Sequence, residues 1–259
     1  MKERDVYIGN ASNKAVEPTK IYVGDSNNVA RLASKIYVGN ASNKAVQVWP
    51  SLKWGDTYQR CEYLLNSGLG QYIKTEVPCT SNIRFVLDFW ITALPGSSTD
   101  ATIMLSQPSY NGFGIEVNAN AYALKLYYNT RNQSTNDQPV ATKTFSSASE
   151  IRSRHVVDFN RSSGFYVDNE LLATSTSTFT TNGVLPLWAY YGGTGYSTGS
   201  VTMEYRVYSF RAYEYDVLIR DMIPCYRKAD QVIGMYDLVN DVFYTNSGSG
   251  TFYKGPDVN

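Results

Sequence analysis

The first 48 residues contain one short motif three times. Each copy has a tyrosine, an aliphatic residue and a glycine, and its tyrosines are Tyr7, Tyr22 and Tyr37, so the period is 22 − 7 = 37 − 22 = 15 residues. A unit of 15 residues has too few apolar side chains to form a core alone, and repeat proteins gain a core by stacking their units. Three units are close to the minimum, so we expect this segment to pack against other copies of the chain.

Within each repeat, a short apolar segment is followed by a turn rich in Gly, Asn and Asp and then by a second apolar segment. These turn residues accept positive φ angles, so the order predicts one β-hairpin per repeat in a domain over residues 1–50. A small β-solenoid is the alternative. Strand alternation places Ile36 and Val38 on one face and Tyr37 on the other. The predicted oligomerisation and attachment residues are therefore Tyr7, Tyr22 and Tyr37.

The remaining residues, 51–259, have an amino-acid composition typical of strands and turns. The whole chain has 22 tyrosines but only 5 methionines and 1 histidine. Residues 84–91 alternate as a strand packed on a core does, with every second residue apolar. Similar patterns predict further strands at 101–106, 113–117, 123–128, 154–160, 185–191 and 201–213.

Turn signals separate these segments. Asp168-Asn169 lies between two apolar runs and predicts a two-residue hairpin. Residues 129–142 are mostly polar and predict a long exposed loop. Many short strands without helical periodicity favour a two-sheet sandwich, so we expect an all-β protein.

The charge balance restricts the partners. Lys and Arg together number 23, as do Asp and Glu, so the formal net charge is zero. No overall field attracts phosphates, and we predict no nucleic-acid partner, although a local basic patch stays open. No apolar run approaches the roughly 20 residues of a membrane helix, and no signal segment is recognisable at the start. We therefore expect a soluble chain that does not insert into membranes.

The cysteines are odd in number and lack the spacing of metal ligands. They are Cys61, Cys79 and Cys225. We expect buried free thiols, and a bridge between Cys61 and Cys79 is the one disulfide to be tested.

The order of strands resembles the laminin-G or concanavalin A-like jelly roll. In that family a strand carrying W/R-H precedes a Y-V-D-G hairpin, and a late strand closes a sheet. Here Arg154-His155 precedes Tyr166-Val167-Asp168-Asn169, so an asparagine stands where the family has glycine. The remaining matching segments are 85–91 and 201–208.

The end of the chain carries a more specific likeness. Residues 220–227, 233–238 and 243–252 are similar to the end of jelly-roll domains in tail and minor structural proteins of phages and prophages of gut Gram-positive bacteria. Repeats of the K-(I/V)-Y-V-G type also precede such domains. The resemblance implies a jelly roll over residues 51–259 in a virion protein, but it does not specify a ligand, because this fold hosts lectins, adhesion modules, spacers and enzymes.

Polysaccharide cleavage requires two carboxyl groups about 5 to 10 Å apart, and the family's enzymes carry them as Glu-x-Asp-x-x-Glu on one strand. This chain has no such run. Glu116, Glu204 and Glu214 are isolated on their segments, and Asp88 stands alone on an apolar strand. We predict that the protein is not an enzyme and has no catalytic residues.

The single histidine, His155, excludes a site built from histidine pairs and shares a strand face with apolar residues, so we expect a hydrogen-bonded, buried or half-buried histidine. Calcium would require clustered oxygen ligands. Asp100, Asp137, Asp158 and Asp168 fall near strand ends without dense Asp-x-Asp spacing, so turn capping is the expected role. We predict neither a metal nor a cofactor.

Residues 187–196 are the best candidate for ligand binding, because tyrosine rings can stack on sugar C–H faces while hydroxyl groups fix orientation. The alternative is that Trp188 and Tyr190 face the core and the glycines only make a turn. We expect Trp188 to be a core residue and predict Tyr191 and Tyr196 as ligand-binding residues. The glycines lack the context of a phosphate loop.

These observations predict a non-enzymatic structural protein of a bacteriophage virion, as a tail, fibre or head-decorating appendage. Its expected partners are other virion proteins, copies of itself in a homotrimer, and host-surface glycans. The alternative is a bacterial cell-surface or secreted lectin-like adhesin, and a glycan-cleaving enzyme is a remote third class.

Overall fold

The protein is described by a computed structural model. Side chains are described for residues 57–66, 70–96, 100–107, 112–129, 139–161, 163–198 and 203–258, with Gly55 and Gly68. Before residue 50 the description is limited to the backbone of six short strands. The chain divides into two compact units, Met1–Gln59 and Arg60–Asn259, and each is described by itself.

In its described residues, the first unit contains three separate two-stranded antiparallel sheets. The hairpins pair β1 (Ile8–Gly9) with β2 (Ala15–Val16), β3 (Tyr22–Gly24) with β4 (Ala30–Leu32), and β5 (Ile36–Gly39) with β6 (Ala45–Trp49). The predicted hairpin in each repeat is confirmed. Tyr7 and the side chains of Tyr22 and Tyr37 lie outside the described residues, so their role in oligomerisation stays a prediction.

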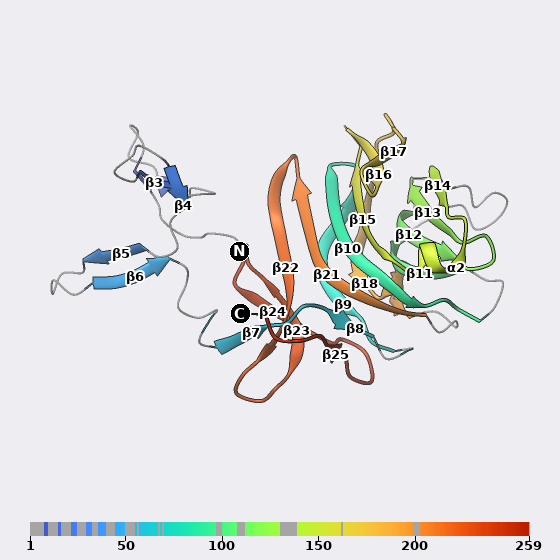
Figure 1. Cartoon of the computed structure of the whole chain (residues 1–259). Helices are drawn as coiled ribbons and strands as arrows, with labels where there is room; N and C mark the ends of the chain where they lie inside the picture. The colour runs from blue at the N-terminus through green and yellow to red at the C-terminus, as the bar shows by residue number, and fades with distance from the viewer. Residues whose placement is uncertain are drawn as a thin grey trace. The chain divides into compact units, whose positions relative to one another are not determined.

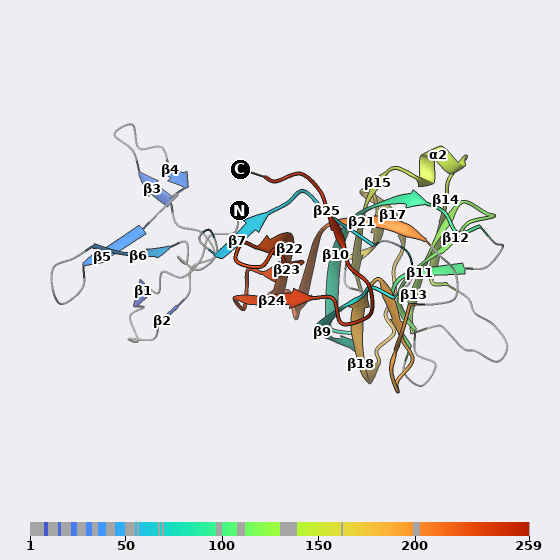
Figure 2. The same ribbon diagram turned by 90° about the horizontal axis from the view of Figure 1, so that it is seen from below.

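The second unit contains two large sheets, as Figures 1 and 2 show. In its described part the larger sheet has eleven strands, eight of them in the order β17-β16-β15-β10-β21-β22-β23-β24, and the smaller has six in the order β14-β13-β12-β11-β19-β20. A further pair is formed by β18 and β9. The elements are β7 (Tyr58–Arg60), β8 (Leu64–Leu65), β9 (Ile73–Thr80), β10 (Ile83–Ala93), β11 (Asp100–Ser106), β12 (Phe113–Asn118), β13 (Ala123–Tyr128), β14 (Ala141–Thr144), α2 (Ala148–Ile151), β15 (Arg154–Asn160), β16 (Gly164–Val167), β17 (Glu170–Ala173), β18 (Thr180–Leu187), β19 (Ala189–Tyr191), β20 (Tyr196–Ser197), β21 (Glu204–Glu214), β22 (Val217–Arg227), β23 (Ile233–Asp237), β24 (Val242–Thr245) and β25 (Tyr253–Lys254).

Aromatic rings join the two sheets. On β10, the inward residues predicted from alternation are fully buried, and Phe85 is one of them. Its ring lies 5.0 Å from that of Phe159 on β15 and 5.5 Å from that of Phe113 on β12, across the sandwich. Rings of this size remove large apolar areas from water and prefer stacked or edge-to-face contacts such as these. The predicted all-β sandwich is therefore confirmed.

The predicted strand over 185–191 is divided between two sheets, which corrects that boundary. β18 ends at Leu187, and β19 begins at Ala189 beside β11. Trp188 between them has a φ of 61°, in the left-handed region. Its indole N–H donates to the Tyr205 carbonyl at 3.3 Å, and it is only 3 % exposed, so the expected core role of Trp188 is confirmed.

The predicted loop over 129–142 is also shorter than expected. Ala141 and Thr142 belong to β14, which pairs with β13 along the edge of the smaller sheet. Residues 130–138 lie outside the described part of the chain.

The cysteines are confirmed as buried free thiols. Burial raises the pKa of Cys61 and of Cys79 to about 12, which keeps both thiols protonated and unreactive near neutral pH. Burial also raises the pKa of Cys225. No helix in the described residues is long and apolar enough to span a bilayer.

We predict that Phe159→Ala lowers the free energy of unfolding by about 3–5 kcal/mol, because the cavity it leaves adjoins four other rings. Val156→Ala on the same strand is the matched control, because Val156 is 39 % exposed, and it should change stability by less than about 0.5 kcal/mol. Urea unfolding followed by tryptophan fluorescence measures both. Equal losses for the two variants would contradict the aromatic packing described above.

Candidate functional site

The two tyrosines predicted to bind a ligand lie opposite each other. Tyr191 on β19 pairs with Tyr196 on β20, and their ring centroids are 5.0 Å apart. Tyr72 stacks on Tyr196 at 5.1 Å, and the Lys74 Nζ lies 5.1 Å from the Tyr196 centroid. Burial by these neighbours raises the pKa of Tyr196 above its usual value. The tyrosine cluster of Tyr72, Tyr191 and Tyr196 therefore ties β20 to the chain before β9, and its rings are partly occupied by one another.

A turn near the end of the chain supports this cluster. The Asn246 carboxamide oxygen accepts a hydrogen bond from the Tyr72 N–H at 3.1 Å, and the Ser247 N–H donates to the Tyr72 carbonyl at 2.8 Å. A Cβ at Gly248 would lie 1.8 Å from the Gly70 carbonyl oxygen, so only glycine allows this close approach.

His155 is a buried, hydrogen-bonded residue, as expected. It is 2 % exposed, and its Nδ1 lies 2.7 Å from the Asp168 Oδ2. Its Nε2 lies 3.1 Å from the Ile151 carbonyl oxygen. Asp168 and Asn169 both have positive φ and form the predicted hairpin turn between β16 and β17. The Asp168 Oδ1 also accepts the Val156 N–H at 2.8 Å, so this carboxylate fixes both the histidine and the turn.

The carboxylates considered for hydrolysis are widely separated or paired with bases. Glu204 and Glu214 stand at opposite ends of β21, and ten residues of strand span roughly 33 Å, far beyond the reach of a catalytic pair. Asp88 forms two hydrogen bonds with Arg154, each 2.8 Å long. Glu116 lies on a different sheet, where it accepts a bond from the Thr102 hydroxyl at 3.4 Å.

The aspartates considered for calcium also have protein partners. Asp100 pairs with Lys125 at 2.6 Å, Asp158 pairs with Arg84 at 2.7 Å, and Asp168 holds His155. Asp137 lies outside the described residues. Among the residues that the structure describes, no three His, Cys, Asp or Glu side chains are grouped so that they could hold a metal ion.

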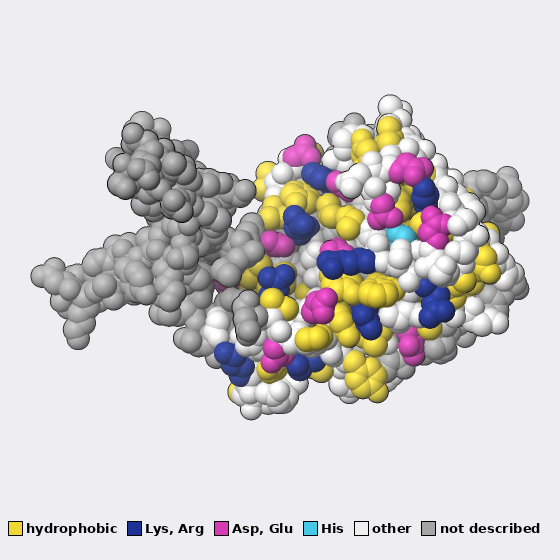
Figure 3. All heavy atoms as spheres, viewed as in Figure 1, with side chains coloured by type: hydrophobic (Ala, Val, Ile, Leu, Met, Phe, Trp, Pro, Cys, Tyr) yellow, Lys and Arg dark blue, Asp and Glu magenta, His cyan; other side chains and the backbone are white. Residues whose placement is uncertain are grey.

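A row of arginine and aromatic side chains covers the outer face of the larger sheet. We define this arginine–aromatic row as Tyr63, Trp90, Arg154, Arg206 and Tyr208. The face of the molecule in Figure 3 shows basic side chains lying among hydrophobic ones. In the strand register, Trp90 on β10 lies opposite Arg206 on one side and Arg154 on the other, so all three project from the same face.

The guanidinium groups of the row lie over aromatic rings. The Arg206 guanidinium carbon is 4.2 Å from the Tyr63 centroid and 4.9 Å from that of Trp90. The Arg154 guanidinium carbon is 3.9 Å from the Tyr208 centroid. Such contacts hold long side chains in one orientation, because the ring face carries partial negative charge. The row is therefore pre-organised before any ligand arrives.

A groove of about 440 Å³ adjoins the row and is lined by Trp90, Thr92, Ser149 and Arg152. The Trp90 indole N–H donates to the Arg152 carbonyl at 2.8 Å, and the Arg152 Nε donates to the Thr92 carbonyl at 3.0 Å. In the described part of the chain neither Arg152 nor Arg206 forms an ion pair, whereas Arg154 is paired with Asp88. The groove is thus lined by the Trp90 indole, by hydroxyl groups and by a guanidinium that has no ion-pair partner among the described residues.

The sequence interpretation missed the row. The alternation of residues 84–91 already places Trp90 on the face opposite the core, and an outward tryptophan beside charged residues is a detectable signal. Its partner Arg206 is 206 − 90 = 116 residues away, so the stacking depends on a strand pairing that local pattern does not specify.

We predict that Asp168→Asn lowers stability at pH 7 by about 1 kcal/mol, since the site is partly exposed. Burial acts to raise the pKa of Asp168, but the hydrogen bonds from His155 and the Val156 N–H outweigh it and lower the pKa below 3.8. A lowered carboxyl pKa stabilises the fold above the unfolded value and loses this contribution as the pH falls through the folded value.

The difference between the wild type and Asp168→Asn should therefore shrink as the pH falls below about 5, as urea unfolding at each pH would measure. Asp216→Asn is the control, because Asp216 occupies a similar turn without an ion pair in the described residues. A difference that stays constant with pH would contradict the assignment.

Comparison of the chain with protein-family models, curated proteins and solved structures finds no match. No relative therefore supplies a function or a site.

Proposed function

We propose that this protein is a non-enzymatic structural component of a bacteriophage virion that presents its β-sandwich to glycans on the host surface. The observation that carries the binding part is the arginine–aromatic row with its adjoining groove. The virion part rests on the repeats and on the resemblance of the chain's end to phage tail proteins.

The row and groove have the chemistry of a sugar site. An indole offers a flat apolar surface to the C–H face of a pyranose, and hydroxyl groups such as that of Ser149 can meet sugar hydroxyls at the rim. Arg152 and Arg206 add positive charge that no described carboxylate neutralises. This charge favours a glycan that carries carboxylate or phosphate groups over a neutral one.

The repeats support a multicopy arrangement. Each two-stranded hairpin is marginal by itself, because two strands bury little apolar surface. Packing three chains about one axis would complete the missing core, and it would also present several weak glycan sites together. A cell-surface or secreted adhesin could use the same binding face, so immunogold labelling of purified phage particles distinguishes the two: labelled virions support the proposal, and unlabelled virions favour the adhesin.

We predict that Trp90→Ala weakens binding to an acidic host-wall polysaccharide about tenfold, or about 1.4 kcal/mol, because it removes the stacking surface. Tyr253→Ala is the control, because Tyr253 is an exposed aromatic residue on β25 that lies outside the row, and it should leave binding unchanged. Surface plasmon resonance on immobilised polysaccharide measures both variants.

The same assay tests the earlier candidates through Tyr191→Ala and Tyr196→Ala. If these variants lose binding while Trp90→Ala does not, the site is the tyrosine cluster and the row is not the binding surface. If none of the three changes binding, the glycan-binding part of the proposal is wrong.

We predict that the intact chain has a mass of about 87 kDa in light scattering, because three copies of 29.0 kDa give 3 × 29.0 = 87 kDa. Replacing Tyr7, Tyr22 and Tyr37 together with serine should yield a monomer, because it removes the predicted packing surface. Tyr253→Ser is the control and should stay trimeric. A wild-type mass of 29 kDa would contradict the assembly proposed for the repeats.

A further inference from the structure

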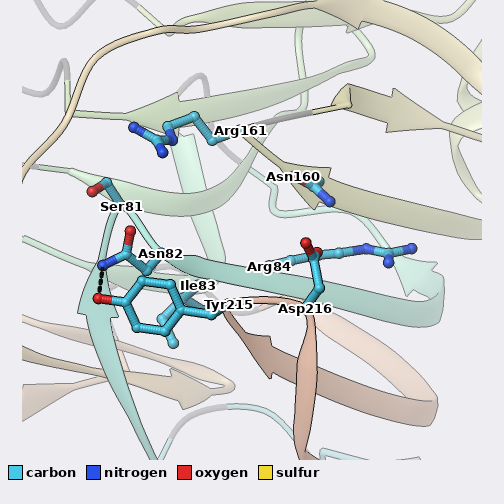
Figure 4. Close-up of a pocket in the computed structure, with 8 residues that line it drawn as sticks. All are labelled: Ser81, Asn82, Ile83, Arg84, Asn160, Arg161, Tyr215 and Asp216. Carbon is cyan, nitrogen blue, oxygen red and sulfur yellow. Dashed lines mark hydrogen bonds between the residues drawn. The ribbon is translucent and has the colours of Figure 1, made fainter.

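A second cavity lies where three turns meet at one end of the larger sheet. Strands β15, β10 and β21 are neighbours, and their antiparallel order brings the turn before β10, the turn after β15 and the turn after β21 to the same end. Figure 4 shows the side chains of the residues that line this cavity. The cavity has a volume of about 190 Å³ and is lined by Ser81, Asn82, Ile83, Arg84, Asn160, Arg161, Tyr215 and Asp216.

Hydrogen bonds between two of the turns fix one wall of this cavity. The Asn82 carboxamide donates to the Tyr215 hydroxyl at 2.8 Å, and the Tyr215 N–H donates to the Asn82 carbonyl at 3.2 Å. Tyr215 and Asp216 have φ angles of 50° and 63°, the conformation of a tight two-residue hairpin turn. The wall is therefore held in place although Tyr215 is 72 % exposed.

The charges that line the cavity differ in whether they already have partners. Arg84 forms two hydrogen bonds with Asp158, at 2.9 Å and 2.7 Å, so its charge is neutralised within the protein. Arg161 and Asp216 form no ion pair in the described part of the chain, with each other or with any other residue. In Figure 4, Arg161 lies on one side of the opening and Asp216 lies on the other.

The effects of these two charges on their neighbours agree with that separation. Burial raises the pKa of Tyr128 on β13 to about 12, and the Arg161 charge acts against this rise. Asp216 acts at the opposite wall, where it adds to the larger effect of Asp158 in raising the pKa of Arg84. The cavity thus has a positive side, where Arg161 lies toward β13, and a negative side, where Asp216 lies near the already paired Arg84.

We propose that this cavity binds a small zwitterion, a molecule that carries an ammonium group for Asp216 and an anionic group for Arg161. A simple anion would be attracted by the Arg161 guanidinium but repelled by the Asp216 carboxylate. A simple cation would be attracted by Asp216 but repelled by Arg161, so for either ion the repulsion offsets the attraction. A molecule with both charges satisfies both sides. The amide groups of Asn82 and Asn160 also line the cavity and can form further polar contacts with the ligand.

The size of the cavity limits the ligand to a small molecule or to the end group of a larger one. Sites for drug-sized ligands occupy about 300–1,000 Å³, and this cavity is smaller. Amino acids and amino-alkyl phosphates have suitable size and charge. This inference is independent of the arginine–aromatic row and of any virion, so it stands or falls separately from the proposed function.

The test is a titration of the intact chain by NMR with matched small probes. The zwitterions are glycine, β-alanine and 4-aminobutyrate, which vary the distance between the charges. Acetate, propionate and butyrate are the matched anions, and methylamine, ethylamine and propylamine are the matched cations. We expect at least one zwitterion to bind about tenfold more tightly than its matched anion and cation. Phosphoethanolamine in place of β-alanine then shows whether the preferred anion is a phosphate or a carboxylate.

Two substitutions test the two sides separately. Arg161→Gln removes the partner of the anionic group, so the cavity should no longer prefer the zwitterion to the matched amine. Asp216→Asn removes the partner of the ammonium group, so the cavity should no longer prefer the zwitterion to the matched anion. Asparagine also accepts positive φ, so Asp216→Asn keeps the turn. Arg211→Gln is the control, because Arg211 is an exposed residue of β21 outside the cavity, and it should change neither preference.

The NMR spectra report directly whether each variant is folded. The proposal is overturned if no zwitterion binds more tightly than its charge-matched analogues. It is equally overturned if Arg161→Gln and Asp216→Asn both retain the wild-type preferences.

Discussion

The packing of β10 between β15 and β21 is the constraint on which the other features depend. Its inward side chains join the sheets through the contact of Phe85 with Phe113 and Phe159. Because side chains alternate along a strand, the same residues fix the outward positions of Asp88 and Trp90. The core and the arginine–aromatic row are therefore two faces of one strand, and a shift of register by one residue would exchange them.

Several basic residues of the second unit form ion pairs with nearby carboxylates. Arg84, Arg154 and Lys125 each have a carboxylate partner within 3 Å. Some described arginines have no ion-pair partner among the described residues. Arg152 and Arg206 lie beside Trp90, and Arg161 lines the second cavity, so these three lie where a ligand could reach them. Arg211 on β21 is a further exposed arginine of this kind and lies outside both places.

Much of the fold could be predicted from local sequence, and the missed parts share one cause. The alternation of β10, the turn at Asp168 and Asn169 and the buried His155 follow from neighbours in the chain. The division of one predicted strand at Trp188 does not follow from its neighbours in the chain. It depends on the hydrogen bond from the Trp188 indole to the Tyr205 carbonyl and on the left-handed φ of Trp188.

The candidate sites also divide into parts set by local sequence and parts set by tertiary contacts. A short hairpin brings together Tyr191 and Tyr196, the two residues predicted from the sequence to bind a ligand, and their binding role stays a prediction. Tyr72, which stacks on Tyr196, comes from more than a hundred residues earlier in the chain. The arginine–aromatic row and the second cavity are each assembled from strands distant in sequence, so only tertiary pairing reveals them.

The second unit is closed by hydrogen bonds between its first and last residues. The Val258 N–H donates to the Arg60 carbonyl at 3.0 Å, and the Glu62 N–H donates to the Pro256 carbonyl at 2.8 Å. The Cys61 N–H donates to the Pro224 carbonyl at 3.1 Å on β22. Mechanical tension applied through the segment before Arg60 would therefore be borne first by these edge bonds, while the aromatic interior stays unloaded.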